Sequence, residues 1–218
     1  MKHLKYIMTA LSASLLVWNA GAQEISREQL VDLGLSVKWS GWNLGATAPE
    51  EPGAMYAWGE VEEKEVYDLS TYKWCKGTQN SLTKYCTDEA WGVNDGKTEL
   101  DPEDDVARVK WGGKWRMPTN AEMDELLVKA KWIGTVYKGV NGFKVVGPNG
   151  KAIFFPFAGD RYKKKLDLVN MGGVYWTSSI DPISPYATAG MYILSGRTNR
   201  GIGLLRYFGH SVRPVCDK

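Results

Sequence analysis

Cysteine and histidine are scarce in this chain, which has three cysteines and two histidines among its 218 residues. Cys75, Cys86 and Cys216 form no C-x-x-C pair, and His210 is the only histidine after residue 3. Structural zinc sites use four cysteine or histidine ligands at short, regular spacings. We therefore expect no metal site built from these residues.

Carboxylates are also scarce in the last third of the chain, where Asp181 is the only one between Gly172 and Val215. The segment consists mainly of aromatic residues, glycines, small hydroxyl residues and arginines. Catalytic centres usually need a general acid, a general base or a metal ligand. No G-x-S-x-G motif occurs, and a serine triad would have to use His210 as its only base. We therefore expect a non-catalytic protein with a polar-aromatic surface, and not an enzyme.

No stretch after residue 22 is apolar over the roughly 20 residues that a transmembrane helix requires. Near the N-terminus, Lys2 and Lys5 precede an apolar run over 7–18, and the small residues at 20–22 form an A-x-A cleavage motif. This pattern predicts a secretory signal peptide over 1–22, against the alternative of a buried N-terminal helix. No cysteine lies near the cleavage motif. We expect an exported protein without a lipid anchor, in the periplasm, on the cell surface or secreted.

The net charge gives no reason to expect nucleic acid as a partner. The whole chain has 27 basic and 25 acidic residues, and removal of Lys2 and Lys5 with the signal peptide would balance the two. Proteins that bind nucleic acids usually carry a basic footprint. The only dense basic run is Arg161-Tyr-Lys-Lys-Lys165, and it suits a solvated loop better than a site for a sulfated glycan or a phosphate.

Residues 31–215 are expected to form one domain, preceded by a polar lead-in over 23–30. Many short aromatic segments alternate with glycines, which favours short antiparallel strands and loops. We expect strands over 31–39, 54–58, 142–146 and 152–157 and in the chain after residue 172, with long irregular loops over 60–100.

Two segments carry signals for helix formation. Asp101-Pro-Glu-Asp104 predicts a short helix over 101–110, with the first aspartate as N-cap and the proline in the first turn. Thr119-Asn-Ala-Glu122 has the pattern of a capping box before an amphipathic helix over 120–130. Two helices among many antiparallel strands predict an α+β domain.

An acidic cluster lies around the start of the first predicted helix. Its members are Asp95, Asp101, Glu103, Asp104 and Asp105. Calcium prefers several oxygen ligands from a flexible loop, which makes the four aspartates calcium candidates. The spacing differs from that of an EF-hand loop, and helix capping accounts for Asp101 and Asp104. We favour capping over calcium and expect no cofactor.

Cys75 and Cys86 are candidates for a disulfide across a loop, because an exported protein enters an oxidising compartment. Cys216 would then be the odd cysteine. Spacing alone does not fix the pairing, so a bridge and free thiols are both open at this point.

Candidate binding residues gather in the acid-poor segment near the C-terminus. The predicted ligand-binding residues are Tyr186, Arg197, Asn199, Arg200, Arg206 and Tyr207. Aromatic and arginine side chains dominate recognition surfaces, because each combines apolar area with directed hydrogen bonds. Strand alternation must bury part of this segment, and Tyr192 is the residue that we expect in the core. Arg213, next to Pro214, is expected to pair inside the fold.

Six sequence strings occur in an order that resembles a known family. They are Val31-Asp-Leu-Gly-Leu-Ser-Val-Lys-Trp39, Tyr56-Ala-Trp-Gly-Glu60, Leu100-Asp-Pro-Glu-Asp-Asp105, Trp111-Gly-Gly-Lys-Trp-Arg-Met-Pro-Thr119, Tyr175-Trp-Thr-Ser-Ser179 and Ser211-Val-Arg-Pro-Val215. Together they resemble the Fibrobacter succinogenes major paralogous domain (FISUMP) family over residues 31–215. That family is similar to the formylglycine-generating-enzyme type of the C-type lectin-like fold, which implies short antiparallel strands, two helices and long loops. Its members are mostly exported proteins of Bacteroidetes and related bacteria.

Two departures restrict what the resemblance implies. Sugar-binding lectins of this fold hold calcium with Glu-Pro-Asn or Gln-Pro-Asp and Trp-Asn-Asp, and Trp91-Gly-Val-Asn-Asp95 resembles that pattern only loosely. Oxidase relatives use a cysteine pair in the active site, whereas the C-terminal region here has only Cys216. The resemblance therefore implies a scaffold and a variable ligand surface just before the last strand, at about 186–207.

These observations predict an exported binding protein that recognises an extracellular glycan or protein through an aromatic-arginine surface. The first alternative is a structural subunit of a surface or fimbria-like assembly, docked to other surface proteins. The second is a polysaccharide-acting enzyme, which would need a pair of carboxylates facing a cleft. The acids over 95–105 are the only cluster that would suit that role.

Overall fold

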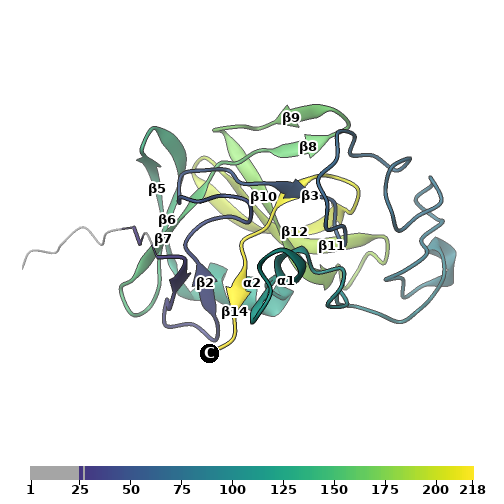
Figure 1. The fold of residues 1–218 in the computed structure, drawn as a ribbon, viewed down its shortest axis with the longest axis horizontal. Coiled ribbons are helices and arrows are strands. Elements are labelled where there is room, and N and C mark those ends of the chain that lie inside the picture. Colours follow the sequence, from purple (N-terminus) through teal and green to yellow (C-terminus); the bar gives the residue numbers. More distant parts are fainter. Residues whose placement is uncertain (1–24, 27) are drawn as a thin grey trace, which may run out of the picture.

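The computed structural model describes residues 25, 26 and 28–218 (Figure 1). The predicted signal peptide over 1–22 lies outside the described residues. In the part of the chain that is described, no helix combines the length and the apolar character needed to cross a membrane.

Short strands dominate the described residues, together with two α-helices and one 3-10 turn. The helices are α1 (Val106–Trp111) and α2 (Asn120–Lys129), and the 3-10 turn is η1 (Glu89–Trp91). The strands are β1 (Leu30–Val31), β2 (Lys38–Ser40), β3 (Met55–Tyr56), β4 (Trp115–Arg116), β5 (Lys131–Tyr137), β6 (Val140–Val146), β7 (Ala152–Pro156), β8 (Asp160–Tyr162), β9 (Lys165–Asp167), β10 (Gly172–Ile180), β11 (Ala187–Leu194), β12 (Arg197–Leu205), β13 (His210–Ser211) and β14 (Val215–Cys216).

The strands of the described chain pair into four small sheets. The largest has the order β12-β11-β10-β13-β3, a second has the order β1-β2-β14-β4, a third has the order β5-β6-β7, and β8 and β9 form a hairpin. Only the β10–β13 pairing is parallel. The predicted α+β class with two helices and short antiparallel strands is therefore confirmed.

The long strand β10 forms the centre of the molecule, because all nine of its residues are buried. Tyr175 on this strand joins a core cluster that also contains Met123 and Leu126 of α2. Its neighbour Trp176 belongs to a second cluster with Val106 of α1. Successive side chains of a strand point to opposite faces, so β10 separates the two clusters and supports both helices.

The two helices differ in how well their starts were predicted. The capping box of α2 is confirmed, because Thr119 accepts from the backbone N–H of Glu122 and the Glu122 carboxylate accepts from the N–H of Thr119. The N-cap of α1 was predicted at Asp101 and is instead Asp105, whose carboxylate accepts the N–H groups of Ala107 and Arg108. That carboxylate also accepts from the N–H of Met117. Asp105 therefore stabilises the helix and the following segment together, and Asp101 only starts the preceding turn.

The prediction of one strand over 31–39 is wrong, because its two ends, β1 and β2, pair with each other antiparallel and the segment folds back on itself. All odd-numbered residues from Val31 to Trp39 are buried, while the even-numbered residues between them are partly or fully exposed. The backbone pairs only at the two ends, in β1 and β2, and Gly34 between them has a φ of +79°. Alternation thus predicted which side chains are buried, but not the reversal of the chain between β1 and β2, in which Gly34 is left-handed.

Residues 60–100 are long loops, as predicted, and they lie beside the five-stranded sheet at one end of the molecule (Figure 1). Their own small core contains Tyr72, Leu82 and Cys86. The prediction that Arg213 pairs inside the fold is also confirmed. Its fully buried guanidinium donates to the Asn43 side chain and to backbone carbonyls of two other segments.

Candidate functional site

The predicted aromatic-arginine set is divided between the two ends of β12. Arg197, Asn199 and Arg200 lie at the start of this strand, whereas Arg206 and Tyr207 follow its end. A strand rises about 3.3 Å per residue, so the two groups are roughly 20–30 Å apart. The set does not form one continuous surface.

Arg206 was predicted to bind ligand, and this prediction is wrong. Its side chain is 1% exposed and lies over the ring of Trp58, with 5.1 Å between the guanidinium carbon and the ring centre. The guanidinium donates to the carbonyl oxygens of Tyr85, Pro185 and Ala187. Arg206 therefore joins the loop over 60–100 to the sheet, and it is not accessible to a ligand.

The residues at the start of β12 are exposed, and two of them already have partners. Arg200 forms an ion pair with Asp124 of α2, and Arg197 donates to the Tyr192 hydroxyl at 3.4 Å. Tyr192 was expected in the core but is only half-buried, because its neighbours Met191 and Ile193 take the core positions. This end of β12 is an exposed polar strip.

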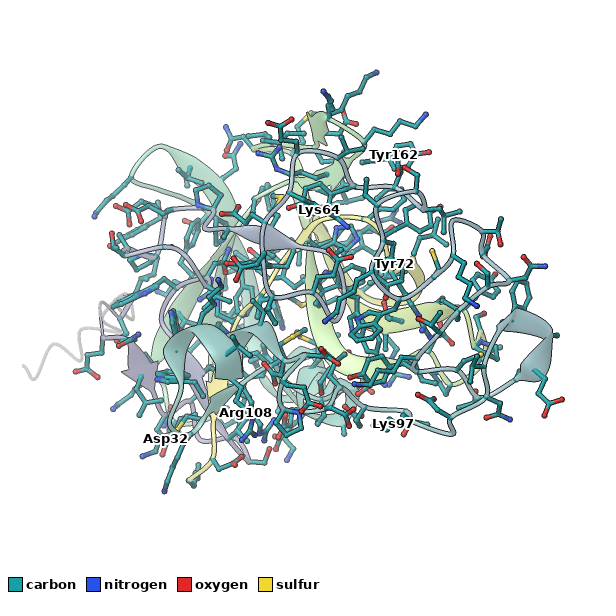
Figure 2. All side chains as sticks on the ribbon, turned by 45° about the vertical axis from the view of Figure 1, so that its right-hand side comes forward. Asp32, Lys64, Tyr72, Lys97, Arg108 and Tyr162 are labelled. Atoms are coloured by element: carbon teal, nitrogen blue, oxygen red, sulfur yellow. The ribbon has the colours of Figure 1, made fainter. Side chains whose placement is uncertain are left out.

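The aromatic residues at the other end contact different neighbours. Tyr186 packs on Trp91, with ring centres 4.3 Å apart. Tyr207 belongs to a surface cluster of three rings with Tyr162 and Phe208, whose centres are 4.6–6.3 Å apart. Tyr162 lies on β8 at the periphery of the molecule (Figure 2). Of the predicted set, Tyr207 is therefore the residue that contributes to an aromatic surface.

The four aspartates considered for calcium are occupied by protein groups. Asp95 accepts the backbone N–H groups of Tyr85 and Cys86. Lys84 forms ion pairs with both Asp101 (2.6 Å) and Asp104 (2.7 Å). Burial opposes ionisation of Asp104, but its hydrogen bonds outweigh that effect and hold its pKa below the ordinary value.

Asp105, the fourth aspartate, is buried as the N-cap of α1. Burial raises its pKa, although three backbone N–H groups oppose that shift. Among the described residues, no group of three or more histidine, cysteine, aspartate or glutamate side chains is arranged to hold a metal ion.

The three cysteines are free thiols, so the predicted Cys75–Cys86 disulfide is not formed. The sulfur of Cys75 donates to the carbonyl of Leu69 at 3.3 Å, and that of Cys86 to the carbonyl of Asp88 at 3.1 Å. The two thiols thus belong to different turns of the loop over 60–100.

A small hollow lies beside the three-ring cluster, between the β8–β9 hairpin and the end of β12. It has a volume of about 190 Å³. We call it the Asp160 hollow; its lining residues are Asp160, Val174, Gly203, Leu204, Leu205, Phe208 and His210. Phe208 also stacks on Tyr162, so the aromatic cluster is continuous with the hollow.

Strand pairing places Asp160 opposite His210. Arg161 and Gly209 exchange both backbone hydrogen bonds, at 2.8 and 2.9 Å, so the residues preceding and following them form the next cross-strand pair. Such pairs have Cβ atoms about 5 Å apart. Asp160 and His210 therefore come from segments 50 positions apart and line the same hollow.

Both side chains have a buried polar atom that no described residue contacts as a hydrogen-bond partner. These atoms are Oδ1 of Asp160 and Nδ1 of His210. Burial lowers the pKa of His210 to about 3, and burial with the nearby Asp167 raises the pKa of Asp160. The imidazole is therefore neutral, with one nitrogen able to accept and one able to donate.

The hollow thus combines a carboxyl group, a neutral imidazole and an aromatic wall. Buried polar atoms without partners are rare in proteins, because each costs about 1–3 kcal/mol. Asp160 is partly exposed, so a ligand hydroxyl group in the hollow could hydrogen-bond with its carboxyl group, and the flat face of Phe208 offers apolar contact. Sequence reasoning missed Asp160, Phe208 and His210 as site residues. Only long-range pairing brings them together, although Tyr162 in the basic run was a visible signal.

The β8–β9 hairpin also borders a second cavity on its other side. Arg161 pairs with Leu166 across the hairpin, and Asp160 pairs with Asp167. Because side chains alternate, Arg161 and Leu166 face away from the Asp160 hollow and line the second cavity, of about 360 Å³.

Searches with models of protein families, curated proteins and solved structures each found no match to this chain.

Proposed function

We propose that this chain is an exported, non-catalytic binding protein that recognises an extracellular glycan through the Asp160 hollow and the adjoining rings of Tyr162, Tyr207 and Phe208. The observation that carries the proposal is a hollow that is lined by the partly exposed Asp160 and is continuous with an aromatic cluster. A sugar ring has an apolar face for aromatic contact and fixed hydroxyl groups that donate and accept. Membership of the FISUMP family and the C-type lectin-like fold belong to the same proposal.

A glycan is preferred over a protein ligand because of the size and polarity of the hollow. Its volume of about 190 Å³ suits one sugar residue better than a protein segment. Protein interfaces of stable complexes bury about 800 Å² on each partner, and they do not depend on two particular polar atoms. In contrast, a polar site rejects ligands that leave its buried groups unpaired.

The proposal is non-catalytic because only one carboxyl group lines the hollow. Glycoside hydrolysis generally uses two carboxyl groups on either side of the scissile bond. Asp167 pairs with Asp160 across the hairpin, but it is exposed and does not line the hollow. Asp160 therefore acts here as a hydrogen-bonding group.

The test is binding of the mature protein to a glycan array, in calcium and again in chelator. We expect a glycan to bind equally in both, because the hollow uses no metal. Asp160→Asn should weaken that binding at least about tenfold, since one lost hydrogen bond in a buried site is worth about 1–3 kcal/mol. The matched control is Asp167→Asn, which removes the same charge from the facing strand and should leave the affinity unchanged.

Three further outcomes would redirect or contradict the proposal. Loss of binding on Arg197→Ala with Arg200→Ala would place the ligand on the exposed strip at the start of β12. No glycan at all, with higher-order species in sedimentation, would favour the assembly-subunit alternative. Release of reducing ends from a bound glycan would contradict the non-catalytic role.

A further inference from the structure

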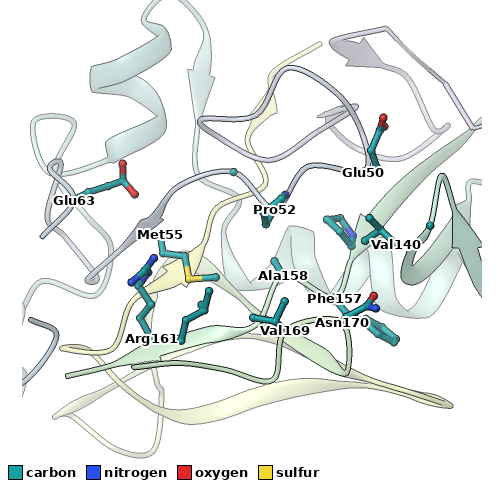
Figure 3. A pocket seen from close by; sticks show the side chains of 14 residues that line it. Glu50, Pro52, Met55, Glu63, Val140, Phe157, Ala158, Arg161, Val169 and Asn170 are labelled. Atoms are coloured by element: carbon teal, nitrogen blue, oxygen red, sulfur yellow. The ribbon is translucent and has the colours of Figure 1, made fainter. Parts of the chain in front are cut away.

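The cavity on the other side of the β8–β9 hairpin has no role in the proposed glycan site. We call it the Arg161 cavity. It lies between this hairpin, the loop before β3 and the end of β7 (Figure 3). Met55 and Ala158 lie on opposite walls, with Arg161 at one end and Asn170 at the other (Figure 3). Its volume of about 360 Å³ is within the range of small-molecule sites in proteins.

The walls of the Arg161 cavity are mainly apolar. The apolar lining residues are Pro52, Met55, Val140, Pro156, Phe157, Ala158, Leu166 and Val169. Leu166 and Val169 remain 42% and 50% exposed. Apolar side chains at the edge of a concave site gain free energy when a ligand removes them from water, at about 25 cal/mol per Å². An apolar ligand body is therefore favoured.

The backbone around the cavity is held in a fixed shape. The Tyr67 hydroxyl donates to the carbonyl of Met55 at 2.6 Å. Asn170 accepts the backbone N–H of Asn141 at 2.7 Å, with a φ of +60°. Leu168, next to the lining residue Val169, has a φ of +59°. A bulky residue in the left-handed region is uncommon, and such strain concentrates at functional sites.

One cationic group at the cavity lacks a partner. The half-buried Arg161 guanidinium forms no hydrogen bond and no ion pair with the residues that the structure describes. Glu50 at the far rim is in an ion pair with Lys138, and Glu63 is exposed and more than 4 Å from any described cationic group. A guanidinium presents a planar set of donors that matches a carboxylate in two parallel hydrogen bonds.

We propose that the Arg161 cavity binds a small apolar molecule that ends in a carboxylate, such as a medium-chain fatty acid. The apolar chain lies between Met55 and Ala158, and its carboxylate accepts from Arg161. A free small molecule is favoured over a protein segment, since the walls form a bounded cavity with the unpaired cation of Arg161 at one end. This site and the Asp160 hollow face opposite sides of one hairpin, so the two proposals are independent.

The experiment compares three ligands with the same chain and different head groups. Binding of decanoate, decanol and decylammonium to the full mature protein is measured by calorimetry. We expect decanoate to bind most tightly. Arg161→Met keeps the apolar stem and removes the charge. It should lower the affinity for decanoate by a factor of about ten or more and leave the affinity for decanol unchanged.

Matched variants separate the site from the net charge. Arg108→Met removes one arginine from α1, on another side of the molecule (Figure 2), and should leave all three affinities unchanged. Glu63→Gln should strengthen decanoate binding several-fold, because it removes the one unpaired acid that lines the cavity. Ala158→Leu fills part of the cavity from its wall and should lower the affinities for decanoate and decanol together.

Several results would overturn the inference. They are no binding of any of the three compounds, equal binding of all three, tightest binding of decylammonium, or decanoate binding that Arg161→Met does not weaken. Asp160→Asn should leave decanoate binding unchanged, because Asp160 does not line this cavity. Failure of the glycan proposal therefore leaves this test intact.

Discussion

Arg206 Nη1 donates to the carbonyl oxygen of Tyr85 at 2.8 Å, across 121 positions of sequence. The Tyr85 ring also packs edge-on against Trp58, over which the Arg206 guanidinium lies. One arginine, one tyrosine and one tryptophan thus connect the loop over 60–100 to the largest sheet. The loop is long and has little regular structure, so these contacts determine its position.

Arg206→Ala should destabilise the fold, and any loss of ligand binding should follow from that destabilisation. The substitution removes the donor to the carbonyl oxygens of Tyr85 and Pro185, while that of Ala187 still accepts from the N–H of Asp181, and we expect a loss of about 2–4 kcal/mol in the free energy of unfolding. Urea unfolding measures this directly. The control Arg197→Ala, an exposed arginine at the other end of β12, should stay within about 0.5 kcal/mol of the wild type. Equal stability of the two variants would contradict the structural role.

Calcium should have no effect on stability, because Lys84 occupies the carboxylates that calcium would need. The melting temperature is expected to be the same in millimolar calcium and in chelator. Lys84→Met should lower the unfolding free energy by about 1–3 kcal/mol, since Asp104 is buried and loses a charged partner. The control Lys97→Met removes a more exposed partner of Asp101 and should cost less. A wild-type melting temperature that rises with calcium would restore the calcium site.

Free cysteines predict a specific pattern of thiol reactivity. The half-buried Cys75 should react with Ellman's reagent in the folded protein, whereas the buried Cys86 and Cys216 should react only after unfolding. Titration of the unreduced, denatured protein should then give three thiols. One thiol would instead indicate that the Cys75–Cys86 bridge forms under oxidising conditions. Cys75→Ser should abolish the fast reaction and serves as the control.

Local signals in the sequence predicted the capping box of α2 and the alternating burial over 31–39, although the backbone of 31–39 folds back on itself instead of forming one strand. The capping box at Thr119 and the alternation of apolar residues over 31–39 each act within one segment, so a few neighbouring residues contain the information. The N-cap of α1 was misplaced by four residues because both Asp101 and Asp105 have suitable side chains. The choice depends on the N–H of Met117, which only tertiary structure places at Asp105.

The candidate sites could not be predicted in the same way. Whether an arginine binds ligand or fills the core depends on its partners, and Arg206 finds its three carbonyls on other segments. Asp160 and His210 meet through a two-residue backbone contact that has no sequence signature. In the basic run, strand alternation alone predicts that Arg161 and Tyr162 point to opposite faces. It does not predict which cavity each side chain would face.

His210 should make the fold sensitive to acid. The imidazole has a pKa of about 3 in the folded protein and 6.5 as its ordinary value, so the unfolded chain binds a proton that the folded protein does not. Its contribution to stability is complete above about pH 6.5 and is lost as the pH falls towards 3. The expected slope is about 1.4 kcal/mol per pH unit for one proton.

Two variants isolate this effect in urea unfolding between about pH 7 and pH 5. His210 is the only histidine after residue 3, and most carboxyl groups stay ionised in both states in this pH range. His210→Gln should remove the slope, whatever its effect on stability at neutral pH. Asp160 acts in the opposite direction, because its raised folded pKa favours the folded state as the pH falls. Asp160→Asn should therefore steepen the loss of unfolding free energy as the pH falls. If His210→Gln leaves the slope unchanged, the imidazole is not held neutral beside Asp160.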